Sequence, residues 1–330
     1  MRLEFKNKDY INISEYNITL KYDSIAHIFD FRTQLDILDY ILEYPECKFY
    51  DNDLLLTGTI LSPNKKVSNK PEFLRYTGYG IAGVLQDCPI PISLYPLQFD
   101  NLSLLDITKI LLEPFGLNYI FTSNILDDLN KKYKKVDISP EMKIKQILNN
   151  LASQRNIILT SNNFGEIVYT RYDKTKFRPV AYFEEGKEGL SNLSLSMNAQ
   201  ALHSEITVIK EASKDNPDAG QFTITNPYVD VFRPTVKILN SGDIFDVEKA
   251  ARNELSKELS NIKITFRSTV FVNAGNTISL LSPKIGINKP TELFVQQTVI
   301  KKEVKEQDSY ILTCLLPDIF SDNEVINILK

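Results

Sequence analysis

The chain has 330 residues, of which 43% are hydrophobic and 24% are charged, so its composition is that of a globular protein and not of a disordered one. At about 150 residues per domain, this length predicts about two domains or three small ones. The 38 basic and 42 acidic residues give a net charge of −4. This balance argues against a dedicated nucleic-acid-binding protein, which usually carries a clustered basic excess.

Residues that commonly build enzyme sites are scarce. His27 and His203 have no Cys or acid at metal-ligand or triad spacing, so we expect structural roles for both. The widely spaced Cys47, Cys88 and Cys314 predict neither a metal site nor a disulfide framework, which is typical of a reducing compartment. Cys88 and Cys314 have apolar neighbours and are predicted to be core thiols. The sequence therefore predicts no catalytic, cofactor-binding or metal-ligating residue, no cofactor and no enzymatic activity.

No targeting or membrane-spanning segment is expected. The first six residues lack the apolar stretch of a signal peptide. No window approaches the ~20 apolar residues that a membrane span requires.

The first ninety residues predict strands. Residues 16–22 alternate strictly between apolar and polar side chains, which places one apolar face on a strand. Residues 48–60 predict a hairpin, with the turn at Asp51-Asn52-Asp53, and residues 72–77 predict a further strand. Pro89, Pro91 and Pro96 interrupt both helix and strand and indicate a boundary.

Residues 103–171 predict a mixture of helices and strands. Ser103 and Asp106 have the spacing of a capping box, and Gly116 is placed as a C-terminal cap. A second helix is expected to begin at Ser139, as N-cap, with Pro140 in its first turn. Residues 157–171 then predict a hairpin around a polar turn.

The remainder of the chain predicts mostly strands. Apolar and polar side chains alternate from near residue 190 and again at 205–210, which predicts strands. Residues 214–221 predict a polar loop. One helix is expected at about 243–260. The last predicted strands are 263–272, 277–281, 292–302 and 310–316.

A glycine motif at Gly78 to Gly83 matches the dinucleotide-binding pattern G-x-G-x-x-G. That site needs a helix directly after the motif to hold the pyrophosphate. Only Val84 to Cys88 precede Pro89, which leaves barely one helical turn. A glycine-rich strand end or bulge is therefore the preferred interpretation.

Clustered charges also have ordinary explanations. The carboxylate pairs Asp51/Asp53, Asp127/Asp128 and Glu184/Glu185 lie in polar segments, so we expect solvated turns and no acid–base chemistry. The basic run 131–135 contains one Tyr and could contact nucleic acid, but nearby acidic residues favour a solvated connector.

The order of these segments resembles the baseplate hub proteins of contractile-tailed phages, the Mu-like hub family. It is also similar to the late control protein D group and to hub domains of type VI secretion spikes. The resemblance is carried by seven groups of segments, which are 28–32, 54–60, 75–80 with 84–88, 104–120, 147–155 with 157–159 and 164–167, 233–234 with 250–255, and 276–287 with 294–299 and 309–316. The family usually has a Trp before its late strand, and this chain has none.

The resemblance implies an α+β, mainly β fold with two tail-tube-like β-barrel domains and a small α/β insert. The implied domains are residues 1–97 as the first barrel, completed by strands within 190–212, residues 98–185 as the insert, and residues 186–330 as the second barrel. The resemblance further implies a homotrimer, which would form a pseudo-sixfold ring in the virion tail baseplate. This ring would join a sixfold tail tube to a threefold central spike.

The implied partners are further copies of the chain, the central spike protein, the tail tube or distal tail protein and the tape measure protein. DNA would pass through the lumen without specific binding. Two alternatives stay open at this stage. The α/β segment is compatible with a cell-wall-binding or wall-degrading tail-tip component, and the glycine motif alone is compatible with a nucleotide-dependent enzyme.

Overall fold

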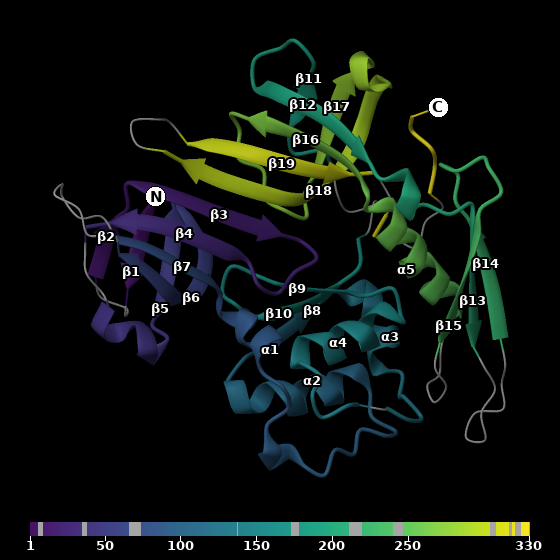
Figure 1. The fold of residues 1–330 in the computed structure, drawn as a ribbon, viewed down its shortest axis with the longest axis horizontal. Coiled ribbons are helices and arrows are strands. Elements are labelled where there is room, and N and C mark those ends of the chain that lie inside the picture. The colour runs from purple at the N-terminus through teal and green to yellow at the C-terminus, as the bar shows by residue number, and fades with distance from the viewer. Residues whose placement is uncertain are drawn as a thin grey trace.

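A computed structural model describes the chain at residues 1–5, 9–34, 38–65, 74–136, 138–172, 178–210, 220–239, 247–303, 308–316, 319–320 and 325–329. Its ribbon shows a long sheet across the top, a helical layer below it and a smaller sheet on the right (Figure 1). The predicted polar loop at 214–221 and the predicted start of the last helix fall mostly outside the described residues.

The N-terminal part forms antiparallel strands, as the alternating sequence predicted. These are β1 (Arg2–Phe5), β2 (Asp9–Asn12), β3 (Glu15–Lys21), β4 (Ile28–Thr33), β5 (Glu46–Asp51), β6 (Asp53–Lys65) and β7 (Leu74–Gly80). In β3 the buried side chains are Tyr16, Ile18 and Leu20. The predicted hairpin is confirmed, and Asn52 makes its turn with a positive φ of 63°.

The middle of the chain contributes most of the helices. In order, it contains α1 (Val84–Asp87), α2 (Leu104–Leu112), β8 (Tyr119–Phe121), α3 (Leu126–Asn130), α4 (Ile144–Ser153), β9 (Ile158–Ser161) and β10 (Ile167–Thr170). Strands β8, β10 and β9 form a three-stranded sheet. Apolar side chains of α2, α4, β9 and β10 share one core, which includes Ile107, Leu111, Ile147, Leu148 and Tyr169.

The two helix starts in this part differ from each other. Ser103 caps α2 through a complete capping box with Asp106, as predicted. The predicted cap at Ser139 is wrong, because α4 begins at Ile144 after Lys143. Residues 139–142 instead form a turn, in which the Met142 amide donates to the Ser139 carbonyl at 3.0 Å.

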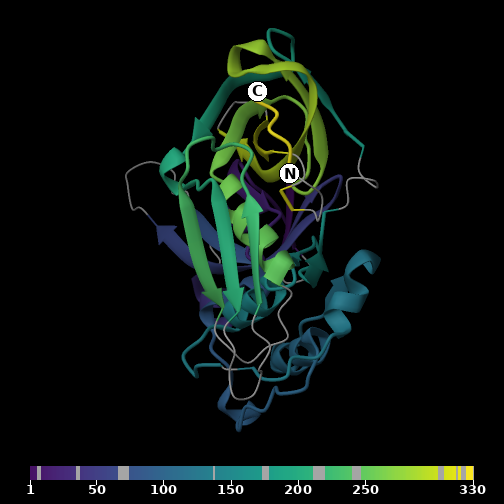
Figure 2. The ribbon, with the colours of Figure 1, turned by 90° about the vertical axis from the view of Figure 1, so that its right-hand side faces the viewer.

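The C-terminal part returns to strands around one long helix. Its elements are β11 (Tyr182–Glu184), β12 (Leu190–Met197), β13 (Glu205–Lys210), β14 (Gly220–Thr225), β15 (Pro234–Leu239), α5 (Val247–Leu259), β16 (Ile262–Ser268), β17 (Thr277–Ser282), β18 (Ile287–Lys302) and β19 (Ser309–Leu315). Helix α5 packs on the sheet β14-β13-β15, which Figure 2 shows face-on.

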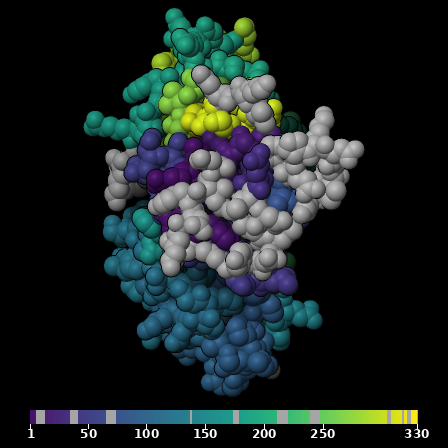
Figure 3. Space-filling view, turned by 90° about the vertical axis from the view of Figure 1, so that its left-hand side faces the viewer, coloured from purple at the N-terminus to yellow at the C-terminus, as the bar shows by residue number. Residues whose placement is uncertain are grey.

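One sheet joins the two ends of the chain. Its strand order is β12-β16-β19-β18-β3-β4-β7-β6-β5-β1-β2, with β17 also paired to β18 and β11 to β17. The joining pair is β18 with β3, where Ile300 lies opposite Ile18. On the face seen in Figure 3, the N-terminal strands lie between the C-terminal strands above and the middle of the chain below.

The strand pairing corrects one prediction. Strands within 190–212 were expected to complete the first barrel, but β12 pairs with β16, and β13 pairs with β14 and β15. The N-terminal strands are extended by β18 instead. Among the described strands the long sheet follows an open path without a closing pair. The fold is therefore mainly β, as expected, while the division into two barrels with an insert stays a prediction.

Candidate functional site

The glycine motif lies at the end of β7 and packs against its neighbours. A Cβ on Gly78 would lie 2.1 Å from the Thr59 carbonyl oxygen and 2.4 Å from the Phe29 ring. The helix that follows, α1, has four residues. The segment therefore lacks the long helix that a dinucleotide site requires, and the predicted strand-end role of the glycines is confirmed.

Both histidines have structural partners, as predicted. The Lys21 amide donates to His27 Nδ1 at 3.2 Å, and His27 Nε2 lies 3.2 Å from the Ser161 carbonyl. Burial lowers the pKa of His27, so the ring is neutral and its Nε2–H donates to that carbonyl. His203 Nδ1 lies 2.7 Å from Glu258 Oε1 in α5, a partner 55 residues away.

The cysteines differ in their surroundings. Cys314 is buried, as predicted, and burial raises the pKa of its thiol, as it does for Cys47. The prediction of a core thiol is wrong for Cys88, which is only partly buried. It directly follows α1, where its carbonyl accepts from the Ile144 amide at 3.1 Å. None of the three forms a disulfide.

Two of the three carboxylate pairs are ordinary turn residues. Asp51 and Asp53 flank the turn residue Asn52. Glu185 accepts from the Ser282 hydroxyl at 2.8 Å and lies 2.6 Å from the Lys284 ammonium.

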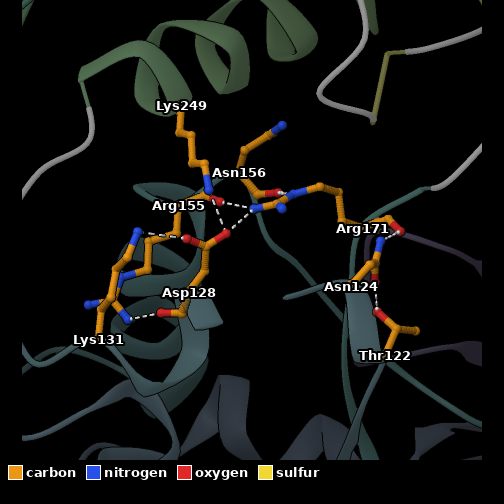
Figure 4. A network of polar contacts seen from close by, with 8 residues as sticks. All are labelled: Thr122, Asn124, Asp128, Lys131, Arg155, Asn156, Arg171 and Lys249. Carbon is orange, nitrogen blue, oxygen red and sulfur yellow. Dashed lines mark hydrogen bonds and ion pairs between the residues drawn. The ribbon is translucent and has the colours of Figure 1, made fainter. Parts of the chain in front are cut away.

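The third pair contains a buried charge, which corrects the prediction of a solvated turn. Asp128 is 6% exposed and accepts from Arg171 at 3.0 Å, Lys249 at 2.5 Å and Lys131 at 3.1 Å. Figure 4 shows these side chains converging on its carboxylate. Burial alone would raise the pKa of Asp128, but the hydrogen bonds from Lys249, Arg171 and Lys131 outweigh it and hold the pKa well below the usual value.

Further contacts extend this ionic cluster into the basic run 131–135. Arg155 donates to the Asp128 backbone carbonyl at 2.5 Å and stacks over the Tyr133 ring at 3.8 Å. Tyr133 itself is fully buried, although the run was expected to be a solvated connector. Because Asp128 lies in α3 and Lys249 in α5, the cluster connects the helical layer to the C-terminal part.

The hairpin β9–β10 connects the same layer to the N-terminal strands. The Thr57 amide donates to the Asn163 carbonyl at 2.8 Å, and the Asn163 side chain donates to the Leu54 carbonyl at 2.9 Å. The Ser161 hydroxyl donates to the Ile25 carbonyl at 3.0 Å. The layer is thus held both to the N-terminal strands and to the C-terminal part of the chain.

Among the described residues, one face of the long sheet carries mostly polar side chains that are partly or fully exposed; we call it the open face. It consists of the side chains of β12, β16, β19, β18, β3, β4 and β7 that point away from the apolar cores. Residues paired across strands share a face, so the row Lys301, Asn17, Asp30 and Thr77 lies on it. Two adjacent grooves of about 490 Å³ and about 340 Å³ both border Lys301 and Glu303.

A second exposed surface lies at the edge strand β15, which pairs only with β13 among the described strands. Several apolar side chains are largely exposed on it and just before it, namely Val231, Phe232, Val236 and Ile238. An unpaired strand edge with apolar side chains favours association with another chain.

Other kinds of site were sought in the described part of the chain. It contains no group of three or more His, Cys, Asp or Glu placed to hold a metal ion. None of its helices has the length and apolar character needed to cross a membrane.

Comparisons with known proteins connect this geometry to phage tails. Residues 82–171 match the family model of the second domain of gp44-like baseplate hub proteins. No curated protein sequence matches the chain.

Solved structures match over nearly the whole chain. A tail protein from Neisseria meningitidis has a TM-score of 0.80 at 18% identity, covering 97% of each chain. The 43 kDa tail protein of prophage MuSo2 from Shewanella oneidensis has a TM-score of 0.79 at 17% identity, covering 96% of this chain and 98% of that one. A type VI secretion component from E. coli has a TM-score of 0.61 at 9% identity, covering all of this chain and 80% of that one. At these identities the likeness establishes the fold.

The class of protein follows from the two comparisons together. The hub-domain match at residues 82–171 and the tail-protein fold of the whole chain together support a phage baseplate hub-like protein. The resemblance noted in the sequence is confirmed at this level.

Proposed function

We propose that this protein is the structural hub of a phage tail baseplate, or of a related injection machine. Three copies form a pseudo-sixfold ring that joins the sixfold tail tube to the threefold central spike. The ring encloses part of the conduit for DNA and the tape measure protein, and the chain performs no catalysis. The observation that carries the proposal is the tail-protein fold over 97% of the chain, combined with the hub-domain match at residues 82–171.

The ring is consistent with the open strand edges. A closed ring needs two different surfaces on each copy that fit each other. The exposed apolar residues of the β15 edge, including Phe232 and Ile238, supply one surface of the kind that buries itself on assembly. The distal tail protein, the tail tube and the spike are the proposed further partners.

The test is the mass of the purified protein in solution, measured by light scattering or sedimentation, with and without the spike protein of the same phage. We expect three times the 37.8 kDa monomer mass, either for the protein alone or once the spike is added. A strict monomer at high concentration, unchanged by spike and tube proteins together, contradicts the proposal.

A further inference from the structure

The last described residues of the chain, 325–329, pack across the boundary between two sheets; we call them the tail. They form neither helix nor strand. Ile328 and Leu329 pack against the apolar core of the C-terminal strands and also against the core that contains Leu255 and Leu259 of α5. That helix covers the small sheet β14-β13-β15, and the C-terminus lies above this sheet in Figure 1.

A single hydroxyl group holds the backbone of the tail. Tyr228, in the loop between β14 and β15, donates through its hydroxyl to the Ile326 carbonyl at 2.9 Å. The same oxygen accepts from the Ile328 amide at 3.2 Å. Burial raises the pKa of Tyr228 to about 12, so the hydroxyl keeps its proton at neutral pH and can both donate and accept.

An asparagine of the tail adds another contact with this loop. The Asn327 side chain donates to the Pro227 carbonyl at 3.1 Å, while its oxygen accepts from the Leu329 amide at 2.9 Å. Hydrogen bonds thus hold the backbone of the tail, and apolar cores receive its side chains. Peptide-binding sites divide the two tasks in the same way, with main-chain bonds for affinity and pockets for specificity.

The loop that receives the tail is held by contacts of its own. The Asn226 side chain accepts from the Tyr228 amide at 3.0 Å, and the Asn226 amide donates to the Ser204 carbonyl at 2.8 Å. Asn226 is 1% exposed, so this support lies inside the fold. Because these contacts do not involve the tail, we expect the loop to keep its shape when the tail leaves.

We propose that the loop 226–229 and the apolar residues beside it on α5 form a peptide-binding groove, and that the tail is its tethered ligand. The occupied groove clasps the small sheet to the C-terminal strands of the long sheet, because the tail packs on both cores. The ligand is an extended apolar chain end with the sequence Val325 to Leu329. This binding occurs within one chain and does not depend on ring assembly.

The experiment measures binding of a fluorescent peptide with the sequence of residues 321–330 to the full-length protein. In the unchanged protein the tethered tail competes with the peptide at a high effective concentration. In the variant Ile328→Asp, Leu329→Asp the tail can no longer pack on the apolar cores. We expect this tail variant to bind the peptide about tenfold more tightly, or better, than the unchanged protein does. A peptide with the same two substitutions should not bind.

The Tyr228 hydroxyl tests the groove itself. Adding Tyr228→Phe to the tail variant should weaken peptide binding about tenfold, because two hydrogen bonds to the peptide backbone are lost. The matched control, Tyr182→Phe, removes the hydroxyl of a tyrosine in β11 that is 78% exposed. It should leave the affinity for the peptide within about twofold.

Hydrogen exchange tests the clasp in the same samples. We expect faster exchange in β13, β14 and β15 of the tail variant, and added peptide should restore their protection. The proposal is overturned if the tail variant binds the peptide no better than the unchanged protein, if Tyr228→Phe leaves the affinity unchanged, or if the peptide restores no protection.

Circular dichroism and thermal unfolding establish that each variant is folded, and the single variant Leu329→Asp replaces the double one if it is not. Tyr228→Phe in the otherwise unchanged chain gives a measurement that needs no altered tail. There the Ile328 amide should exchange faster, because it loses its acceptor. An unchanged exchange rate at this amide would also overturn the proposal.

Discussion

At the scale of single residues, close packing and charge burial decide what each position tolerates. Gly78 and Asp128 illustrate the two cases. Gly78 touches a carbonyl and a ring, so no side chain fits. Asp128 is a buried charge that three cations compensate. The sequence singled out both positions. It predicted a solvated turn at Asp128, whereas the structure shows that this carboxylate is buried.

The glycines of the motif give the first prediction. Gly78→Ala is expected to destabilise the protein by about 2 kcal/mol, because its Cβ would press on the Thr59 carbonyl and the Phe29 ring. Gly80→Ala, whose nearest neighbour would be 3.4 Å away, is the control and should cost less than about 1 kcal/mol. Urea unfolding measures both. Equal losses in the two variants would contradict the close-packing explanation.

The buried carboxylate gives a pH-dependent prediction. Asp128→Asn should cost about 3 kcal/mol at pH 7, because Arg171 and Lys249 lose the charge that compensates them. The folded-state pKa of Asp128 is lowered, so its stabilisation is present above the unfolded pKa of about 3.9 and is lost as pH falls through the folded value.

The difference in unfolding free energy between the unchanged protein and the variant Asp128→Asn should therefore shrink from pH 7 to pH 3. The exposed neighbour Asp127 supplies the control, and Asp127→Asn should change stability by less than about 0.5 kcal/mol at either pH. A loss for Asp128→Asn that is the same at pH 3 and pH 7 would show that the charge is not responsible.

At the scale of elements, local sequence predicted most strands and helices but placed one helix start wrongly. Ser103 and Ser139 have similar sequence surroundings for a cap, yet only Ser103 caps a helix. The Ser139 carbonyl accepts from Met142, and the chain then forms a bridge between Lys143 and Pro89 before α4 begins. A contact 54 residues away thus overrides the local signal.

This difference gives a prediction with an internal control. Ser103→Ala should destabilise the protein by about 1 kcal/mol, because the Asp106 amide loses its acceptor and the capping box is broken. Ser139→Ala should be nearly neutral, since the hydrogen bond that Ser139 makes within the described residues uses its backbone carbonyl and would survive the substitution. Thermal unfolding distinguishes the two, and a larger loss at Ser139 would contradict the observed helix start.

At the scale of the whole molecule, the pairing of β3 with β18 makes the two ends of the chain one sheet. Ile18 and Ile300 are both buried at this junction. Alternation in the sequence shows that each strand has an apolar face, but it does not show which strands pair. The open face therefore exists only because residues nearly 300 positions apart lie side by side.

The junction gives the last prediction. Ile300→Ala should cost about 3 kcal/mol, because it leaves a cavity between β3 and β18. Hydrogen exchange should then speed up in both strands. Val299→Ala, on the half-buried opposite face, is the control and should cost about 1 kcal/mol or less. Faster exchange confined to β18 would mean that the two ends do not unfold together.

The sequence by itself determined the strand-rich class, the hairpins, the α2 cap, the structural histidines and the hub-like resemblance. These depend on local periodicity, on turn chemistry and on the order of segments along the chain. Only the tertiary structure decided that Asp128 is buried among cations, that β18 and not a strand within 190–212 extends the N-terminal strands, and that residues of both charges from distant strands share the open face. Each of these depends on contacts between distant segments, and burial and strand register have no local signal that fixes them.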